Sequence, residues 1–155
     1  LTAEAFSCKL PMFADDMTLY ASRRTQAEAV ATVTDSLSAI SVDLDELGLR
    51  INTTKTVTLM ISKSSQPLST PIVFNQQPLT QVSSTRILGV IVDSDVSWSG
   101  HIDFIVRKTC TKIGALRRCF RQLSLKATRQ FILSVILPDL LYCCSCFAMK
   151  LSAKD

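Results

Sequence analysis

The sequence predicts an α+β protein, in which a strand-rich part at residues 1–97 precedes an all-helical part at residues 98–155. Two observations lead to this prediction. In the first part, short β-branched and aromatic runs separated by turn residues surround one long segment of helical period. From about Ser99 onward, the apolar residues recur at helical spacing only. With 155 residues, the chain forms one domain at most, or part of one.

The composition excludes several classes of protein. Apolar residues make up 47% of the chain and charged residues 19%, which excludes intrinsic disorder. Six cysteines are too few for a disulfide-stapled scaffold of this length. The net charge of +4 is unevenly distributed, because residues 1–62 carry 5 basic and 8 acidic side chains and residues 104–155 carry 10 and 2. The second part is therefore expected to face a polyanion, with a solvated helix surface as the alternative.

The first elements are a hairpin and a long helix. Two short strands are expected at residues 9–13 and 17–22, around a turn that contains Asp15 and Asp16. Thr25, followed three residues later by Glu28, predicts a capping box at the start of a helix over residues 25–47. The apolar stripe of this helix has spacings of three and four, and Gly48 ends it. The expected stripe consists of Val30, Val33, Leu37, Ile40, Leu44 and Leu47.

Further antiparallel strands are expected after this helix, because short apolar runs alternate with polar turns. They are predicted at residues 49–51, 57–62, 72–74 and 85–93, with a turn at residues 75–77. These strands and the packed helix complete the α+β part.

Three helical segments are expected in the second part. The first begins near Ser99, the second is capped by Ser124 and runs to Pro138, and a third apolar segment follows. The stripe of the first consists of Ile102, Ile105, Val106, Ile113, Leu116 and Phe120. Residues 131–149 are apolar over nearly the length of a bilayer span, but Pro138 and a carboxylate interrupt them. Two shorter buried helices explain this stretch better, so no membrane partner is expected.

Asp15 and Asp16 form the sharpest chemical feature of the sequence. Two adjacent carboxylates at a hairpin tip are costly to bury without compensation, and a divalent cation is the usual partner. A Mg²⁺ ion held in this way can orient phosphates and stabilise the charge that develops in phosphoryl transfer. An Asp pair is also common in ordinary turns, so the pair alone is a weak signal.

The flanking residues strengthen that signal. Residues 13–16, Phe-Ala-Asp-Asp, resemble the aromatic-Ala-Asp-Asp box of reverse transcriptases. Downstream segments are similar, in order, to those of non-LTR (LINE-type) retrotransposon polymerases. Residues 48–56 are similar to their Gly-Leu-x-x-Asn-x-x-Lys-Thr segment, and residues 87–90 contain their Leu-Gly-Val strand. Residues 98–102 resemble the Trp-x-x-His-Ile start of the thumb, and residues 138–142 resemble a Pro-x-Leu-x-Tyr stretch.

The resemblance implies a partial polymerase palm at residues 1–97, followed by an all-helical thumb-like bundle at residues 98–155. It implies an RNA-directed DNA polymerase that copies an RNA template from a DNA primer and deoxynucleotides with two Mg²⁺ ions. Asp15 and Asp16 would be catalytic metal ligands, and Lys55 would donate a proton to pyrophosphate or contact phosphate. Leu88 and Gly89 would contact the primer. Such an enzyme is expected inside the cell, at work in the nucleus.

Basic residues of the second part are the expected contacts to nucleic-acid phosphates, because aromatic residues for base stacking are scarce there. These residues are Arg107, Lys108, Arg117, Arg118, Arg121 and Arg129.

In the resembling family, a third catalytic Asp and a nucleotide-holding Gly-rich segment precede the Asp pair. They would lie before Leu1, in an upstream remainder of the polyprotein, so the chain alone is expected to have no polymerase activity. The alternative function is a catalytically dead nucleic-acid-binding relic. His101 is expected to have a structural role at the start of a helix. The cysteines of the second part, at positions 110, 119, 143, 144 and 146, are expected to be buried thiols and not zinc ligands.

Overall fold

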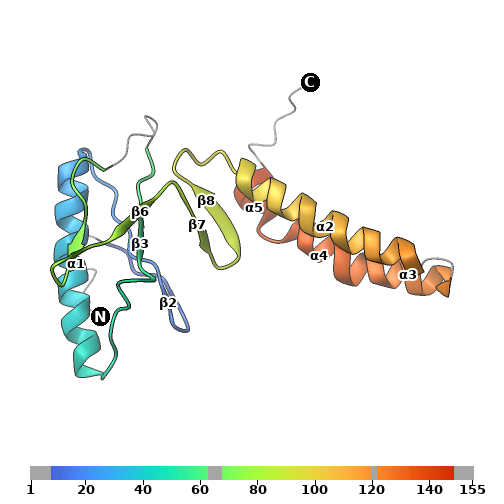
Figure 1. Cartoon of the computed structure of the whole chain (residues 1–155), viewed down its shortest axis with the longest axis horizontal. Coiled ribbons are helices and arrows are strands. Elements are labelled where there is room, and N and C mark those ends of the chain that lie inside the picture. The colour runs from blue at the N-terminus through green and yellow to red at the C-terminus, as the bar shows by residue number, and fades with distance from the viewer. Residues whose placement is uncertain (1–7, 63–67, 120–121, 149–155) are drawn as a thin grey trace.

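The computed structural model describes residues 8–62, 68–119 and 122–148. It confirms the mixed α+β class, with a strand-rich first part beside one long helix and a helical second part that extends away from it (Figure 1). The strands are β1 (Met12–Phe13), β2 (Asp16–Met17), β3 (Val57–Leu59), β4 (Val73–Phe74), β5 (Gln77–Pro78), β6 (Thr80–Val82), β7 (Ser84–Ile87) and β8 (Val90–Asp93). The helices are α1 (Gln26–Glu46), α2 (Ser99–Cys119), α3 (Leu125–Phe131), η3 (Ile132–Ile136), α4 (Leu137–Leu141) and α5 (Cys144–Phe147).

Helix α1 forms as its sequence predicts. The capping box is present, because the Thr25 hydroxyl accepts the Glu28 N–H at 3.3 Å and the Glu28 carboxylate accepts the Thr25 N–H at 3.4 Å. The helix ends before Gly48, which adopts a φ of 72°. Of the predicted stripe, Leu37, Ile40 and Leu44 are buried. Leu47 is 69% exposed, because it lies beyond the last helical turn.

The strands pair in four small sheets. The pairs β1–β2, β4–β5 and β7–β8 are antiparallel hairpins, of which the first was predicted as a hairpin. In contrast, β3 pairs with β6 in parallel, where antiparallel strands were predicted. The parallel pair is possible because the long connection between β3 and β6, which includes the β4–β5 hairpin, lets the chain return in the same direction. The single strand predicted at residues 85–93 is instead the β7–β8 hairpin.

The core of the first part lies between α1 and the strands beside it. Buried Leu37 of α1 clusters with three residues of the β4–β5 region, namely Ile72, Phe74 and Leu79. Ile51 packs against this cluster from a segment predicted to be a strand, but residues 49–51 form none. Leu10 and Leu19, on either side of the β1–β2 hairpin, pack against Ile40 and Leu44 of α1. The base of this hairpin is therefore anchored on the helix.

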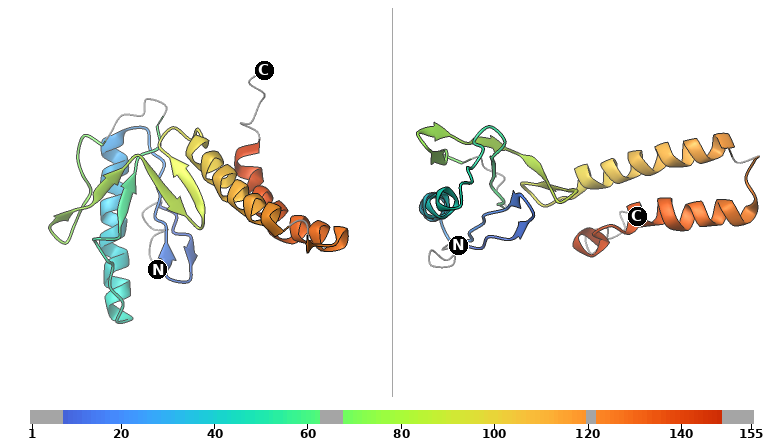
Figure 2. Two further views of the ribbon diagram at one scale, coloured as in Figure 1. Left: turned by 45° about the vertical axis from the view of Figure 1, so that its right-hand side comes forward. Right: turned by 90° about the horizontal axis from the view of Figure 1, so that it is seen from below.

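The second part is an antiparallel helical hairpin, in which α3, η3 and α4 run back along α2 (Figure 2). The buried side chains of α2 are His101, Ile105 and Thr109. The predicted stripe was partly wrong, since Val106 and Ile113 are about half exposed. A two-helix arrangement covers only one face of α2, and that face includes polar His101 and Thr109. Phe120, the last predicted member, lies outside the described residues.

Pro138 does not separate two helices, contrary to the prediction. It lies in the first turn of α4, directly after the π-helical segment η3. A wider π turn shifts the carbonyl that the proline ring would otherwise meet, so the helix continues to Leu141. The expected burial of this stretch was also wrong, because several of its large apolar side chains are exposed. Within the described ranges, no helix combines the length and the apolar character needed to cross a membrane.

Candidate functional site

Asp15 and Asp16 lie at the exposed tip of the β1–β2 hairpin. Ala14, before them, adopts a left-handed φ of 53°, and Asp16 pairs with Phe13 across the hairpin. Both aspartates are exposed, and Phe13 is 67% exposed. Lys9 and Tyr20 exchange two backbone hydrogen bonds of 2.9 and 3.0 Å at the base. The hairpin therefore holds two carboxylates in solvent on a base that is fixed to α1.

The chemistry of this pair suits a hard cation. Two carboxylates that keep their water access are the donors that Mg²⁺ takes from proteins, with waters or substrate phosphates as the remaining ligands. In the described part of the chain, no three His, Cys, Asp or Glu side chains come together as a metal-binding group. At the hairpin tip, Asp15 and Asp16 are the residues that could hold such an ion.

Hydrogen bonds to Asn52 stabilise the turn within the segment from Gly48 to Thr56. The Asn52 Oδ1 accepts the N–H groups of Thr54 and Lys55 at 3.0 and 3.2 Å. Its carbonyl accepts the Thr56 N–H at 3.0 Å and the Thr56 hydroxyl at 2.8 Å. This is an Asx-type turn, and it leaves the Lys55 side chain exposed. No hydrogen bond or ion pair within the described part joins Lys55 to Asp15 or Asp16.

Leu88 and Gly89 form the two-residue turn of the β7–β8 hairpin. Their φ values of 47° and 89° are both positive, as a type I′ turn requires, and a leucine rarely adopts this conformation. The Tyr142 hydroxyl donates a 2.7 Å hydrogen bond to the Leu88 carbonyl. The Tyr142 ring also lies 3.5 Å from the position that a Cβ on Gly89 would take. Tyr142, which follows α4, therefore contacts and holds the turn that the resemblance assigns to primer contact.

The junction between the two parts of the chain is built around His101. This residue is 1% exposed, and its Nδ1 accepts the N–H of Ile91 in β8 at 3.3 Å. Its ring meets the Phe147 ring edge-on, with 5.3 Å between centroids, and Trp98 also contacts Phe147. Burial, together with the positive charge of Arg86, lowers the pKa of His101. The structural role predicted for this histidine agrees with these contacts.

Asp93 shapes the loop that leads from β8 into α2. Its carboxylate accepts the Ser97 N–H and the Ser97 hydroxyl, both at 2.7 Å. Partial burial raises the pKa of Asp93, but the hydrogen bonds from Ser97 and Trp98 outweigh it, and the pKa is lowered. These bonds hold Trp98 at a φ of 65°, where its ring reaches Phe147.

The basic side chains of the helical hairpin fall into two groups. Lys108 and Lys112 pair with the Asp139 carboxylate at 2.9 and 2.5 Å, and they tie α2 to α4. These hydrogen bonds lower the pKa of Asp139. Arg107, Arg117, Arg118 and Arg129 are exposed, and none forms an ion pair with a described carboxylate. Arg121 lies outside the described residues.

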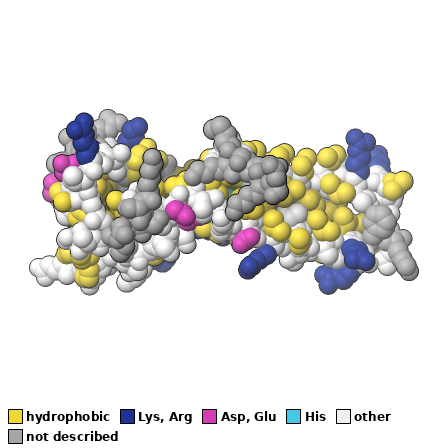
Figure 3. Space-filling model, turned by 90° about the horizontal axis from the view of Figure 1, so that it is seen from above, with side chains coloured by type: hydrophobic (Ala, Val, Ile, Leu, Met, Phe, Trp, Pro, Cys, Tyr) yellow, Lys and Arg dark blue, Asp and Glu magenta, His cyan; other side chains and the backbone are white. Residues whose placement is uncertain are grey.

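The exposed surface of the hairpin is both apolar and basic. In Figure 3, hydrophobic side chains cover much of its upper face, and Lys and Arg side chains gather at its edges. On α2, Arg107 and Arg118 are 11 positions apart, or three helical turns, so they lie on the same face, about 16 Å apart along the axis. That face is opposite the buried His101–Ile105–Thr109 side.

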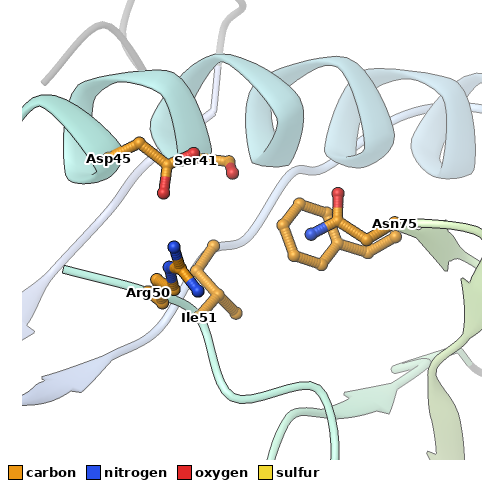
Figure 4. Close-up of a pocket in the computed structure, with 6 residues that line it drawn as sticks. Ser41, Asp45, Arg50, Ile51 and Asn75 are labelled. Atoms are coloured by element: carbon orange, nitrogen blue, oxygen red, sulfur yellow. The ribbon is translucent and has the colours of Figure 1, made fainter. Parts of the chain in front are cut away.

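A shallow pocket lies between α1, the segment that follows it and the β4–β5 hairpin. It is lined by Ser41, Asp45, Arg50, Ile51, Phe74 and Asn75. The Asp45 carboxylate and the Arg50 guanidinium both point into it (Figure 4). None of these residues was predicted as a site residue, and none belongs to the Asp15–Asp16 hairpin.

The cysteines differ from their prediction as buried thiols. Cys110, Cys119, Cys143 and Cys146 are exposed, and Cys144 is half-buried. The apolar run around residues 143–146 suggested burial, but α5 is a single short turn that buries Phe147 instead.

The chain matches no protein-family model, no curated protein and no solved structure.

Proposed function

We propose that this chain is the palm and thumb part of an RNA-directed DNA polymerase of the non-LTR retrotransposon type. The proposed reaction is transfer of a nucleotidyl group to a primer 3′-hydroxyl on an RNA template, inside the cell and at nuclear DNA. The observation that carries the proposal is the tip of the β1–β2 hairpin, where Asp15 and Asp16 stand exposed in a Phe-Ala-Asp-Asp turn.

Three further features support the proposal. The Leu88–Gly89 turn is fixed by Tyr142, as a primer-contacting turn would need to be. The Asn52 turn presents Lys55 to solvent, where it could reach a phosphate. The exposed arginines of α2 and α3 supply positive charge for a template–primer backbone.

In this function, Asp15 and Asp16 would hold Mg²⁺. When bound, the ion would neutralise the charge that develops on the transferring phosphoryl group. The chain's own residues orient the substrates: Leu88 and Gly89 approach the primer with their backbone, and the arginines hold phosphates. Lys55 would contact or protonate the departing pyrophosphate.

Metal binding by the tip tests the catalytic assignment on the chain itself. Mn²⁺ replaces Mg²⁺ at oxygen sites and broadens nearby NMR signals, so we expect broadening of the amides of residues 13–17. Asp15→Asn should abolish it. Asp43→Asn is the control, because Asp43 carries the same charge on α1. Broadening that persists in Asp15→Asn, or that is absent from the hairpin, would contradict the catalytic assignment.

Binding to an RNA–DNA duplex tests whether the exposed arginines contact nucleic-acid phosphates. The affinity for an RNA–DNA duplex should fall with salt with a log–log slope of about −4 if four arginines reach phosphates. Replacing Arg107, Arg117 and Arg118 by Gln should reduce that slope to about −1. The matched control replaces Lys9, Arg24 and Arg50, which removes the same charge from the first part, and should leave most of the slope.

The two measurements also separate the polymerase from the alternative function. A catalytically dead nucleic-acid-binding relic would show the salt-dependent duplex binding but no metal binding at Asp15 and Asp16. Equal slopes for the two triple variants would indicate that the arginine surface is a solvated helix face and does not bind phosphates.

A further inference from the structure

Cys143, between α4 and α5, and Cys146, within α5, bring two thiols together on the surface. Their Sγ atoms are 3.8 Å apart, and both side chains are exposed. The Cys146 N–H donates to the Cys143 carbonyl at 2.9 Å, and Cys143 adopts a left-handed φ of 55°. A hydrogen-bonded turn therefore fixes the two thiols side by side, at a Cys-x₂-Cys spacing.

The geometry is compatible with a covalent bond between them. A turn of this kind keeps the two Cα atoms within about 7 Å, near the range that a disulfide spans. The sulfur atoms need to approach by about 1.8 Å to reach the S–S bond length. Rotation of two exposed side chains can supply this movement without unfolding the turn.

No other thiol of the described chain has a comparable neighbour. Cys110 and Cys119 are exposed on α2, and no other cysteine contacts them. The Cys8 Sγ is buried and directed at the Thr32 carbonyl, at 3.7 Å. Cys144 is half-buried, and no hydrogen bond joins its thiol to another described cysteine.

We propose that Cys143 and Cys146 form a redox-active dithiol that low-molecular-weight disulfides, such as glutathione disulfide, oxidise to an intrachain disulfide. One thiolate attacks the external disulfide, forms a mixed disulfide and releases one glutathione thiolate. The second cysteine, once deprotonated, displaces the other glutathione and closes the protein S–S bond. The protein loses two electrons and two protons, and one glutathione disulfide becomes two glutathione thiols.

The contact between the two thiols affects the titration of Cys143. The contact with Cys146 raises the pKa of Cys143, and burial adds to the effect. Because the thiolate is the attacking species, oxidation should become faster as the pH rises toward the thiol pKa.

The dithiol also lies next to the residue that holds the β7–β8 turn. Tyr142, which donates to the Leu88 carbonyl, directly precedes Cys143 in the chain. A disulfide would restrain the backbone of Cys143, and hence the direction of the Tyr142 side chain. We expect the oxidised protein to hold Leu88 and Gly89 differently from the reduced one. This inference does not depend on the proposed polymerase function.

The test is equilibration of the full chain in glutathione buffers, followed by alkylation and mass spectrometry. The peptide with residues 143–146 should lose two hydrogen atoms. The fraction closed should exceed the glutathione adducts on Cys110 and Cys119 by about ten-fold, because the neighbouring thiol has a high effective concentration. Glutathione adducts alone, or a disulfide between two chains, would overturn the proposal.

Single serine variants identify the bonded pair. Cys144→Ser is the matched control and should close as the wild type does, whereas Cys143→Ser and Cys146→Ser should not. Closure that survives in either of the latter would assign the bond to Cys144 and refute the pairing. Amide exchange of Gly89 in oxidised and reduced protein tests the link to Tyr142, and an unchanged rate would refute that link.

Discussion

Replacement of His101 by leucine should destabilise the junction between β8 and α2. Leucine fills much of the same volume but has no acceptor for the partly buried N–H of Ile91. A buried donor left without a partner costs about 1–3 kcal/mol. Loss of the edge-on contact with Phe147 adds about 0.5–1.5 kcal/mol. At pH 7.5 we therefore expect the free energy of unfolding to fall by about 1.5–4.5 kcal/mol.

The same residue should make the stability depend on pH. The pKa of His101 is lowered in the folded protein, so the unfolded chain binds the proton more readily. The stability present above the unfolded pKa of about 6.5 is then lost as the pH falls toward the folded pKa. The physical cause is that a proton on Nδ1 removes the acceptor for Ile91, while Nε2 has no partner among the described residues. The sequence contains one histidine, so no other side chain of this type titrates in the window.

Urea unfolding at a series of pH values between about 5 and 7.5 measures this effect. The midpoint of the wild type should fall on acidification, and that of His101→Leu should change much less. NMR titration of the single imidazole gives its pKa directly. An imidazole pKa at or above 6.5, or equal pH dependence in the two proteins, would refute the assignment of His101 as a neutral acceptor.

Three further predictions concern other parts of the fold. Gln76 adopts a φ of 61° in the β4–β5 turn, a conformation that glycine adopts without strain. Gln76→Gly should therefore stabilise the protein by about 0.5–1 kcal/mol in urea unfolding. The control Gln81→Gly, in strand β6, should destabilise it in the same assay. Tyr142→Phe should cost about 0.5–1.5 kcal/mol and speed the amide exchange of Gly89, while Tyr20→Phe should leave that exchange unchanged. Asp139→Asn should lower the urea midpoint at neutral pH and low salt. Hydrogen bonds from Lys112 and Lys108 lower the pKa of Asp139 in the folded protein. The contribution of this carboxylate to the free energy of unfolding is therefore present above pH 3.8 and lost as the pH falls through the folded pKa. The urea midpoints of the two proteins should converge at low pH, and also in high salt, which screens the ion pairs.

Short-range features were predictable because their causes lie within a few residues. The capping box at Thr25, the Ser124 cap and the stop at Gly48 depend on local hydrogen bonds and backbone conformation. The placement of Asp15 and Asp16 at a hairpin tip follows from the alternation of apolar and turn residues around them. The α+β class follows from the change of hydrophobic period near Ser99.

Other features depend on which segments meet in space. The parallel pairing of β3 with β6 and the role of Asp139 as partner of Lys108 and Lys112 join residues more than 20 positions apart. The burial of His101 in place of Val106 depends on where Phe147 and β8 lie. The exposed thiols of Cys143 and Cys146 reflect the brevity of α5, which their apolar neighbours did not indicate.

The sequence by itself determined the α+β class, helix α1 with its capping box, the Ser124 cap and the place of Asp15 and Asp16 at the tip of the first hairpin, because these follow from local propensity and periodicity. The tertiary structure alone decided which face of each helix is covered, which charges are neutralised, and that Tyr142 reaches Leu88 across 54 positions of the chain. The physical reason is that burial and ion pairing depend on the distance between segments. A local pattern limits that distance but does not fix it.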